Sequence, residues 1–193
     1  MTMTFCRIFE RVMREDLNVH SYDASLAGCN FNVGVHPSGF RITASGFSQK
    51  LPDLVGSVTK RINTLIEEMC SPNPSPELEK SFKTQTENLL TETQNFAYDP
   101  PYEIASYNLR LLLEERVWHV DEYAIALKSP SLTMRKCAEV VRDCISRRVN
   151  VHSLVMGNVD EADVRKLVGA VERGEIGRGA KRQQKHLIAH PHN

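Results

Sequence analysis

The sequence predicts an α+β fold, in which helices pack mainly on one face of a small, mostly antiparallel sheet. Between residues 29 and 46, apolar residues alternate with polar ones, which is the pattern of strands with one buried face. Residues 149 to 157 are apolar on both faces, as in a central strand, and we expect them to join the same sheet. Most of residues 53 to 147 show helical spacing instead.

The first predicted helix covers residues 3 to 17, where five apolar residues form one stripe: Phe5, Ile8, Phe9, Val12 and Met13. A β-hairpin follows, with Phe31 to Val35 as its first strand and Phe40 to Ala44 as its second. The segment from His36 to Gly39 contains proline and glycine and predicts the turn.

Six further helices are expected. One begins at Asp53 and ends before the proline-rich stretch 70–76, and the next has Ser75 as its N-cap and Pro76 at its first position. Apolar residues cover most of the circumference of the helix at 102–116, which predicts burial on several sides. The remaining helices follow at these positions: 120 to 128, from about Thr133, and from about Asp160. Three strands make a small sheet for so much helix, so we expect its edges to pair with strands from elsewhere.

The composition narrows the function classes. Lys and Arg number 24 and so do Asp and Glu, so no overall field attracts the chain to nucleic acid or to an anionic membrane. No apolar run approaches the ~18 residues that a membrane span needs. The five scattered cysteines lack a C-x-x-C spacing, which favours core thiols and a cytoplasmic protein. Cys137 and Cys144 are too far apart along one helix, roughly 10 Å, to form a disulfide with each other.

Two histidine segments come close to zinc motifs. The segment His119 to Tyr123 resembles the inverted motif H-x-x-E-H, but Tyr123 stands where the second histidine ligand belongs. The segment His186 to His190 has the histidine spacing of H-E-x-x-H, but Leu187 replaces the glutamate. The first segment is better explained as a surface histidine at the start of a helix. The second is better explained as part of an unstructured tail, which could bind a stray metal weakly. We therefore expect no stoichiometric zinc.

Other site motifs are missing from the sequence. It has neither a G-x-S-x-G elbow nor a phosphate-binding loop. A basic cluster in the tail has none of the interleaved aromatic residues that nucleic-acid binding favours; it consists of Arg178, Lys181, Arg182 and Lys185. The sequence assigns no catalytic residue.

Three blocks, in order along the chain, carry recognisable motifs. The first block covers residues 17 to 52 and carries two motifs, Y-x-A-x-L-A-G and G-[YF]-x-x-K, whose matching residues are Tyr22, Leu26, Ala27, Gly28, Gly46, Phe47 and Lys50. The second block contains Pro100, Tyr107, Leu109 and Arg110. In the third, Gly157 and Asn158 match a strand that ends in H-G-N, and Met156 replaces the histidine. Together, these blocks resemble the middle, or third, domain of the pitrilysin/insulin-degrading-enzyme (insulinase) family of zinc metallopeptidases.

The resemblance extends from about residue 3 to residue 173, so we expect a domain at 1–173 and a disordered tail at 174–193. It implies a LuxS/MPP-like metallopeptidase fold that lacks its first strand. Related peptidases enclose a chamber with four such domains, and zinc and H-x-x-E-H belong to the first. The chain would then be a fragment, a truncated product or a stand-alone relic.

The resemblance also implies a function. The third domain walls the chamber, contacts the peptide substrate and holds no metal ligand. We therefore expect a non-catalytic portion of a peptide-hydrolysing enzyme, without a cofactor of its own and inactive alone. Its expected partners are the catalytic half of a related peptidase, or a second copy of this chain, and peptide; nucleic acid and membranes are not expected. A stand-alone binding or assembly module without peptidase activity is the alternative.

Overall fold

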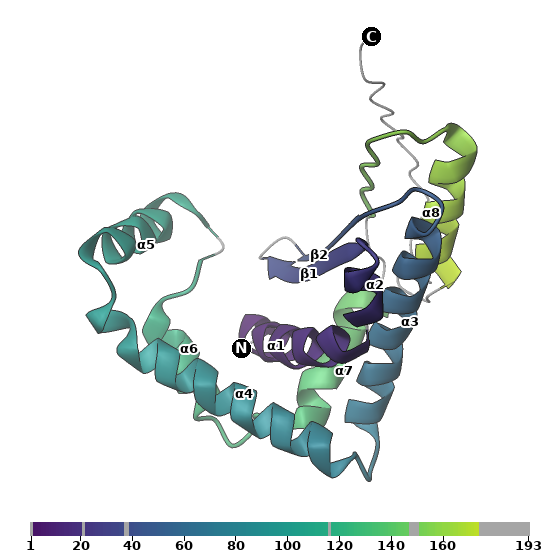
Figure 1. The fold of residues 1–193 in the computed structure, drawn as a ribbon. Coiled ribbons are helices and arrows are strands. Elements are labelled where there is room, and N and C mark those ends of the chain that lie inside the picture. Colours follow the sequence, from purple (N-terminus) through teal and green to yellow (C-terminus); the bar gives the residue numbers. More distant parts are fainter. Residues whose placement is uncertain (1, 21, 37–38, 116, 147–150, 174–193) are drawn as a thin grey trace.

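The computed structural model describes residues 2–20, 22–36, 39–115, 117–146 and 151–173. These residues form a mostly helical structure with one small antiparallel sheet, as Figure 1 shows. In chain order, its elements are α1 (Thr2–His20), α2 (Tyr22–Leu26), β1 (Asn30–His36), β2 (Gly39–Ser45), α3 (Leu51–Cys70), α4 (Pro76–Asn95), η1 (Phe96–Tyr98), α5 (Pro101–Leu113), α6 (Val120–Leu127), α7 (Met134–Ser146) and α8 (Glu161–Arg173). The predicted tail, 174–193, lies outside the described residues.

Helix α1 supplies the centre of the core. Its predicted apolar stripe is buried in full, and Phe9 is 0% exposed. The stripe is covered because α1 packs against α7, α4 and the first strand of the hairpin. Helix α3 packs in turn against α7 and α8, so segments far apart in the sequence enclose one core. The helices predicted at the start of the chain and from residue 53 are thereby confirmed.

The predicted hairpin is also confirmed. Strands β1 and β2 pair antiparallel, from Asn30 opposite Ser45 to His36 opposite Gly39. Six residues of one face contact the core or border it: Phe31, Val33, Val35, Phe40, Ile42 and Ala44. Helices α1 and α3 lie against this hairpin, which agrees with helices on one face of the sheet.

The predicted third strand is wrong for the residues that the structure describes there. Within 151–157 only Val155 forms an isolated bridge, and the sheet consists of β1 and β2. Leu154 and Met156 are exposed, so the apolar residues of this segment are not covered on two faces as in a central strand. An apolar run alone therefore did not indicate a strand. Residues 149 and 150 lie outside the described part of the chain.

Helices α4, α5 and α6 form an arm beside the core, and α5 lies at its far end (Figure 1). The base of the arm is fixed, because α4 packs against α1 and α6. The predicted N-cap of α4 is confirmed, since Ser75 Oγ accepts a hydrogen bond from the Leu78 N–H at 3.2 Å. Among the described helices, none combines the length and the apolar character needed to cross a membrane.

The burial predicted for the helix at 102–116 is wrong. Helix α5 has no buried residue, and Leu112 is 84% exposed. Its apolar residues surround the helix, but the described elements do not enclose it. Four of them follow one stripe, spaced seven, ten and eleven residues from the first: Tyr102, Leu109, Leu112 and Leu113. This set is called the α5 stripe below.

Candidate functional site

The residues singled out by the resemblance lie in three places. Those of the first block lie at the base of the hairpin, those of the second on α5, and those of the third before α8. Figure 1 shows these places apart from one another. The structure therefore does not bring the motif residues into one site, and each place has to be considered by itself.

At the base of the hairpin, two glycines allow a close approach of the backbone. Gly28 has φ +78° after α2, a conformation that side chains rarely adopt, and a Cβ there would lie 3.5 Å from the Phe47 ring. Gly46 has φ +147°, and a Cβ there would lie 2.9 Å from the Cys29 Cα. Gly46 thus lets the chain close over the buried Cys29, and Gly28 lies beside the ring of Phe47, which is 69% exposed.

The other residues of the first block face solvent. Tyr22, Leu26 and Ala27 are exposed on and after α2, above the same hairpin base. Lys50 immediately precedes α3, and its Nζ lies 3.8 Å from the Asp53 carboxylate in an exposed ion pair. Such a pair contributes little to stability. The exposed residues can contact another molecule, but they form no catalytic arrangement.

On the arm, Tyr107 ties α5 to the segment before α6. Its hydroxyl donates to the Trp118 carbonyl at 3.0 Å, and its ring meets Phe96 edge-on with 4.7 Å between centroids. Burial raises the pKa of this phenol. Pro100 precedes the first turn of α5, and Arg110 pairs with Glu114 at 2.9 Å. These motif residues hold the arm in shape, while Leu109 belongs to the exposed α5 stripe.

The third block lies before α8. Gly157 has φ +125°, and its carbonyl accepts a hydrogen bond from the Val159 N–H at 3.0 Å, so this position makes a turn. No atom lies within 4 Å of a Cβ placed on it. Asn158 is exposed. The pair shapes the entry to α8.

The segment that resembles a zinc motif instead begins a helix. His119 is the N-cap of α6: its Nδ1 accepts from the Asp121 N–H at 3.3 Å, and its own N–H donates to Glu122 Oε2 at 2.9 Å. Tyr123 is buried, with the Arg7 guanidinium 4.6 Å from its ring centroid. The glutamate three residues after the histidine was a capping signal that sequence reasoning missed.

No group of three or more His, Cys, Asp or Glu side chains among the described residues could hold a metal ion. The side chains of His119 and Glu122 are engaged at the helix cap. The residues of this part of the chain therefore do not fit a catalytic zinc. The tail histidines lie outside the described residues.

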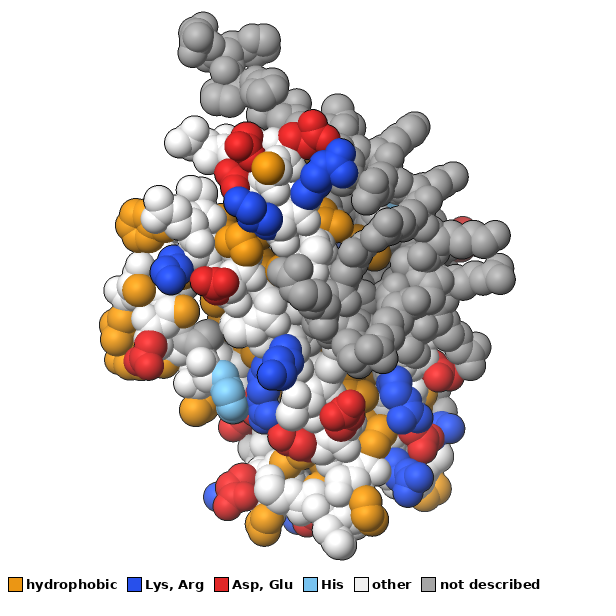
Figure 2. Space-filling model, turned by 90° about the vertical axis from the view of Figure 1, so that its right-hand side faces the viewer, with side chains coloured by type: hydrophobic (Ala, Val, Ile, Leu, Met, Phe, Trp, Pro, Cys, Tyr) orange, Lys and Arg blue, Asp and Glu red, His pale blue; other side chains and the backbone are white. Residues whose placement is uncertain are grey.

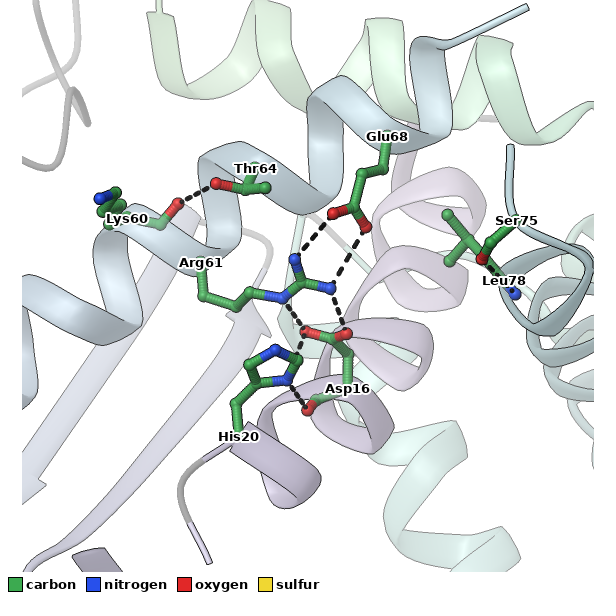
Figure 3. Close-up of polar contacts among 8 residues, drawn as sticks. All are labelled: Asp16, His20, Lys60, Arg61, Thr64, Glu68, Ser75 and Leu78. Carbon is green, nitrogen blue, oxygen red and sulfur yellow. Dashed lines mark hydrogen bonds and ion pairs between the residues drawn. The ribbon is translucent and has the colours of Figure 1, made fainter. Parts of the chain in front are cut away.

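Sequence reasoning also missed an ion-pair network between α1 and α3 (Figure 3). Arg61 donates two hydrogen bonds to Asp16, at 2.6 and 2.7 Å, and two to Glu68, at 2.8 and 3.2 Å. The hydrogen bonds to Asp16 are the main cause that raises the pKa of Arg61. His20 Nδ1 lies 3.0 Å from the Asp16 carbonyl oxygen. The network braces two core helices.

Two further apolar surfaces stand out among the described residues. One is the α5 stripe, and the other is an apolar cavity of about 540 Å³ that α1, the hairpin and α7 border, with Cys6, Phe9, Val35, Phe40 and Cys144 in its walls. On the face drawn in Figure 2, acidic and basic side chains are interspersed over the described atoms, without a large area of one sign. The candidate binding surfaces are therefore apolar, and the face drawn in Figure 2 has no charged patch that suggests another.

Comparison with known proteins gives the family. The family described as the middle or third domain of peptidase M16 matches residues 1–126. The chain is 25% identical to human insulin-degrading enzyme over 152 residues, which are 79% of this chain and 14% of that protein. It is 27% identical over 165 residues to the peroxisomal insulin-degrading enzyme-like 1 of Arabidopsis thaliana, covering 86% of this chain and 16% of that protein.

The chain belongs to the peptidase M16 middle-domain family, as its motifs predicted. It spans only about a seventh of the length of the human relative. Helices α7 and α8 follow the residues that the family match covers.

Proposed function

We propose that this chain is a non-catalytic, chamber-wall portion of an insulin-degrading-enzyme-like metalloendopeptidase, which contacts the peptide while a catalytic half hydrolyses it. The family match over residues 1–126 is the observation that carries this proposal. The proposal includes a LuxS/MPP-like fold for this domain and a cytoplasmic location. In this proposal the catalytic half holds the zinc, and the described residues here include no group of three or more His, Cys, Asp or Glu side chains that could hold a metal ion.

The α5 stripe supports the proposed contact with a larger assembly. Leu109, Leu112 and Leu113 are exposed together on one side of a helix, and contiguous exposed apolar side chains commonly mark a protein interface. The nearest charged pair, Arg110 with Glu114, is satisfied within α5. The stripe therefore offers apolar contact, and we assign it to the catalytic half.

A complementation assay tests the proposal. The part of human insulin-degrading enzyme that precedes its matched segment serves as the catalytic half, and cleavage of a fluorogenic peptide is measured with and without this chain. We expect no cleavage by the chain alone and at least about a tenfold increase when it is added to the catalytic half, because a completed chamber holds the peptide in place.

Two aspartate variants separate the interface from a general loss of solubility. Leu112→Asp, on the α5 stripe, should abolish the increase, whereas Val19→Asp, at another strongly exposed position, on α1, should preserve it. If the chain binds the catalytic half or peptide but never raises cleavage, the alternative holds: a stand-alone binding or assembly module. If it binds neither, the proposal is wrong.

A further inference from the structure

Two cysteines from opposite ends of the chain meet at the apolar cavity. Cys6 lies on α1 and Cys144 on α7, and both thiols border the cavity. Helices α1 and α7 pack directly against each other, and Cys144 lies close enough to Cys6 to help raise the pKa of that thiol. We propose that Cys6 and Cys144 form a reversible disulfide when the protein meets a peroxide, so that this pair is an oxidation site that joins α1 to α7.

The packing of the two helices keeps the pair in place. Helix α7 packs against α1, and the Cys137 thiol donates to the Phe5 carbonyl at 3.0 Å, next to Cys6. Cys144 follows Cys137 by seven residues, or about two helical turns, so both thiols lie on the side of α7 that faces α1. The backbones are therefore held together before any bond forms.

The two thiols differ in reactivity. Cys144 is exposed, whereas Cys6 is 4% exposed. Burial, and then the neighbouring Cys144, raises the pKa of Cys6 to about 12, so this thiol stays protonated. Cys137 is fully buried, and burial raises its pKa as well. Peroxide therefore meets Cys144 first, and Cys6 acts as the resolving thiol.

The chemistry balances with hydrogen peroxide as the oxidant. The Cys144 thiolate attacks one peroxide oxygen, the O–O bond breaks, and the other oxygen leaves as water after protonation, which gives a sulfenic acid. The Cys6 sulfur then attacks the Cys144 sulfur and loses its proton, and the S–O bond breaks. The oxygen leaves as a second water, and a thiol reductant reverses the bond.

The bond would join two parts of the chain that the family match separates. Cys6 lies within the matched residues 1–126, whereas α7 follows them. Cross-linking residues 138 positions apart restricts the unfolded chain, which stabilises the folded one. Oxidation should therefore hold α7 against α1 and restrict the motions of the helices that border the cavity.

Trypsin mapping tests this directly. The purified chain is treated with hydrogen peroxide, the remaining thiols are alkylated, and the digest is analysed by mass spectrometry with and without reduction. Cleavage after Arg7, Lys136, Arg142 and Arg147 places Cys6, Cys137 and Cys144 on separate peptides. We expect peptide 1–7 linked to peptide 143–147, and this species should disappear on reduction.

Variants complete the test. The melting temperature of the oxidised monomer should exceed that of the reduced one by about 5 to 10 °C, in the unmodified chain and in the control Cys70→Ser. The exposed-site variant Cys144→Ser should fold and show neither the linked peptide nor the shift. Peptide 1–7 linked to 137–142, a disulfide between two chains, or Cys144 oxidised without a disulfide would each overturn the proposal.

Discussion

Helices α1 and α5 are both rich in apolar residues, yet they have opposite environments. Helix α1 buries a complete stripe beneath α4, α7 and the hairpin, whereas α5 buries no residue. The difference lies in what surrounds each helix. Helix α1 receives its cover from segments of this chain, and α5 presents an apolar stripe that the described elements leave uncovered. Hydrophobic pattern thus predicts a helix, but it does not tell whether another segment of the chain covers the apolar stripe.

The largest expected effect contrasts these two helices directly. Phe9→Ala should lower the free energy of unfolding by about 3 to 5 kcal/mol, because it removes a fully buried ring and leaves a cavity. Leu112→Ala should change it by less than about 0.5 kcal/mol, since that side chain is exposed. Urea denaturation followed by circular dichroism measures both. Equal losses would mean that α5 is packed as firmly as α1.

A smaller effect concerns the hairpin base. Gly46→Ala should cost about 2 to 3 kcal/mol, because the new Cβ meets the Cys29 backbone in addition to the unfavourable φ. Gly39→Ala shares the positive φ but meets no atom within 4 Å, so its cost should be about 1 kcal/mol. Thermal melts of the two variants make the comparison. If Gly39→Ala lost more stability than Gly46→Ala, the tighter backbone constraint would lie at the hairpin turn.

The ion-pair network should matter less than either. Arg61→Met leaves the carboxylates of Asp16 and Glu68 without their shared partner, and we expect a loss of about 1 to 2 kcal/mol, reduced by partial exposure. Arg135→Met, which removes an exposed pair with Glu139 within α7, should cost less than about 0.5 kcal/mol. Urea denaturation of the two variants gives the two losses of stability for comparison. Similar losses would show that the network between α1 and α3 stabilises the fold no more than an exposed ion pair does.

Alkaline pH should lower the free energy of unfolding by a smaller amount, which grows as the pH rises. The pKa of Cys6 is raised in the folded protein to about 12, so the unfolded chain loses this proton first, and stability falls as pH rises above 9. Between pH 9.5 and 11, the Cys6→Ala variant should show a slope shallower by about 1 kcal/mol per pH unit. Urea denaturation at several pH values gives the slope of the free energy of unfolding against pH for each protein. A constant difference in stability between the two proteins does not change this slope. Parallel slopes would contradict the burial of a neutral thiol.

Much of the fold followed from local periodicity. The stripe of α1, the alternation in β1 and β2, and the Ser75 cap are properties of neighbouring residues, and these predictions were confirmed. The exposure of α5 and the missing third strand depend on which elements come to lie nearby, which local spacing does not contain. The Arg61 network joins residues 45 positions apart, so its pairing was equally invisible in the sequence.

The motif residues show the same division. The resemblance named Gly28 and Gly46 but gave no reason for them, and the structure supplies one in their positive φ and in the close contact of Gly46 with Cys29. In the segment that resembles a zinc motif, Glu122 caps α6 through the His119 N–H. The meeting of Cys6 with Cys144 required the three-dimensional packing of α1 on α7.

Hydrogen–deuterium exchange on the mixture of this chain and the catalytic half tests the central claim most directly. Free in solution, the amides of α1 should be protected, and those of α5 should exchange fast, because exposed elements with few buried contacts open easily. In the mixture, exchange across residues 101–113 should slow by about tenfold or more, while α1 stays as it was. If α5 exchanges at the same rate in both samples while the mixture cleaves peptide, the α5 stripe is not the interface, and the account is contradicted.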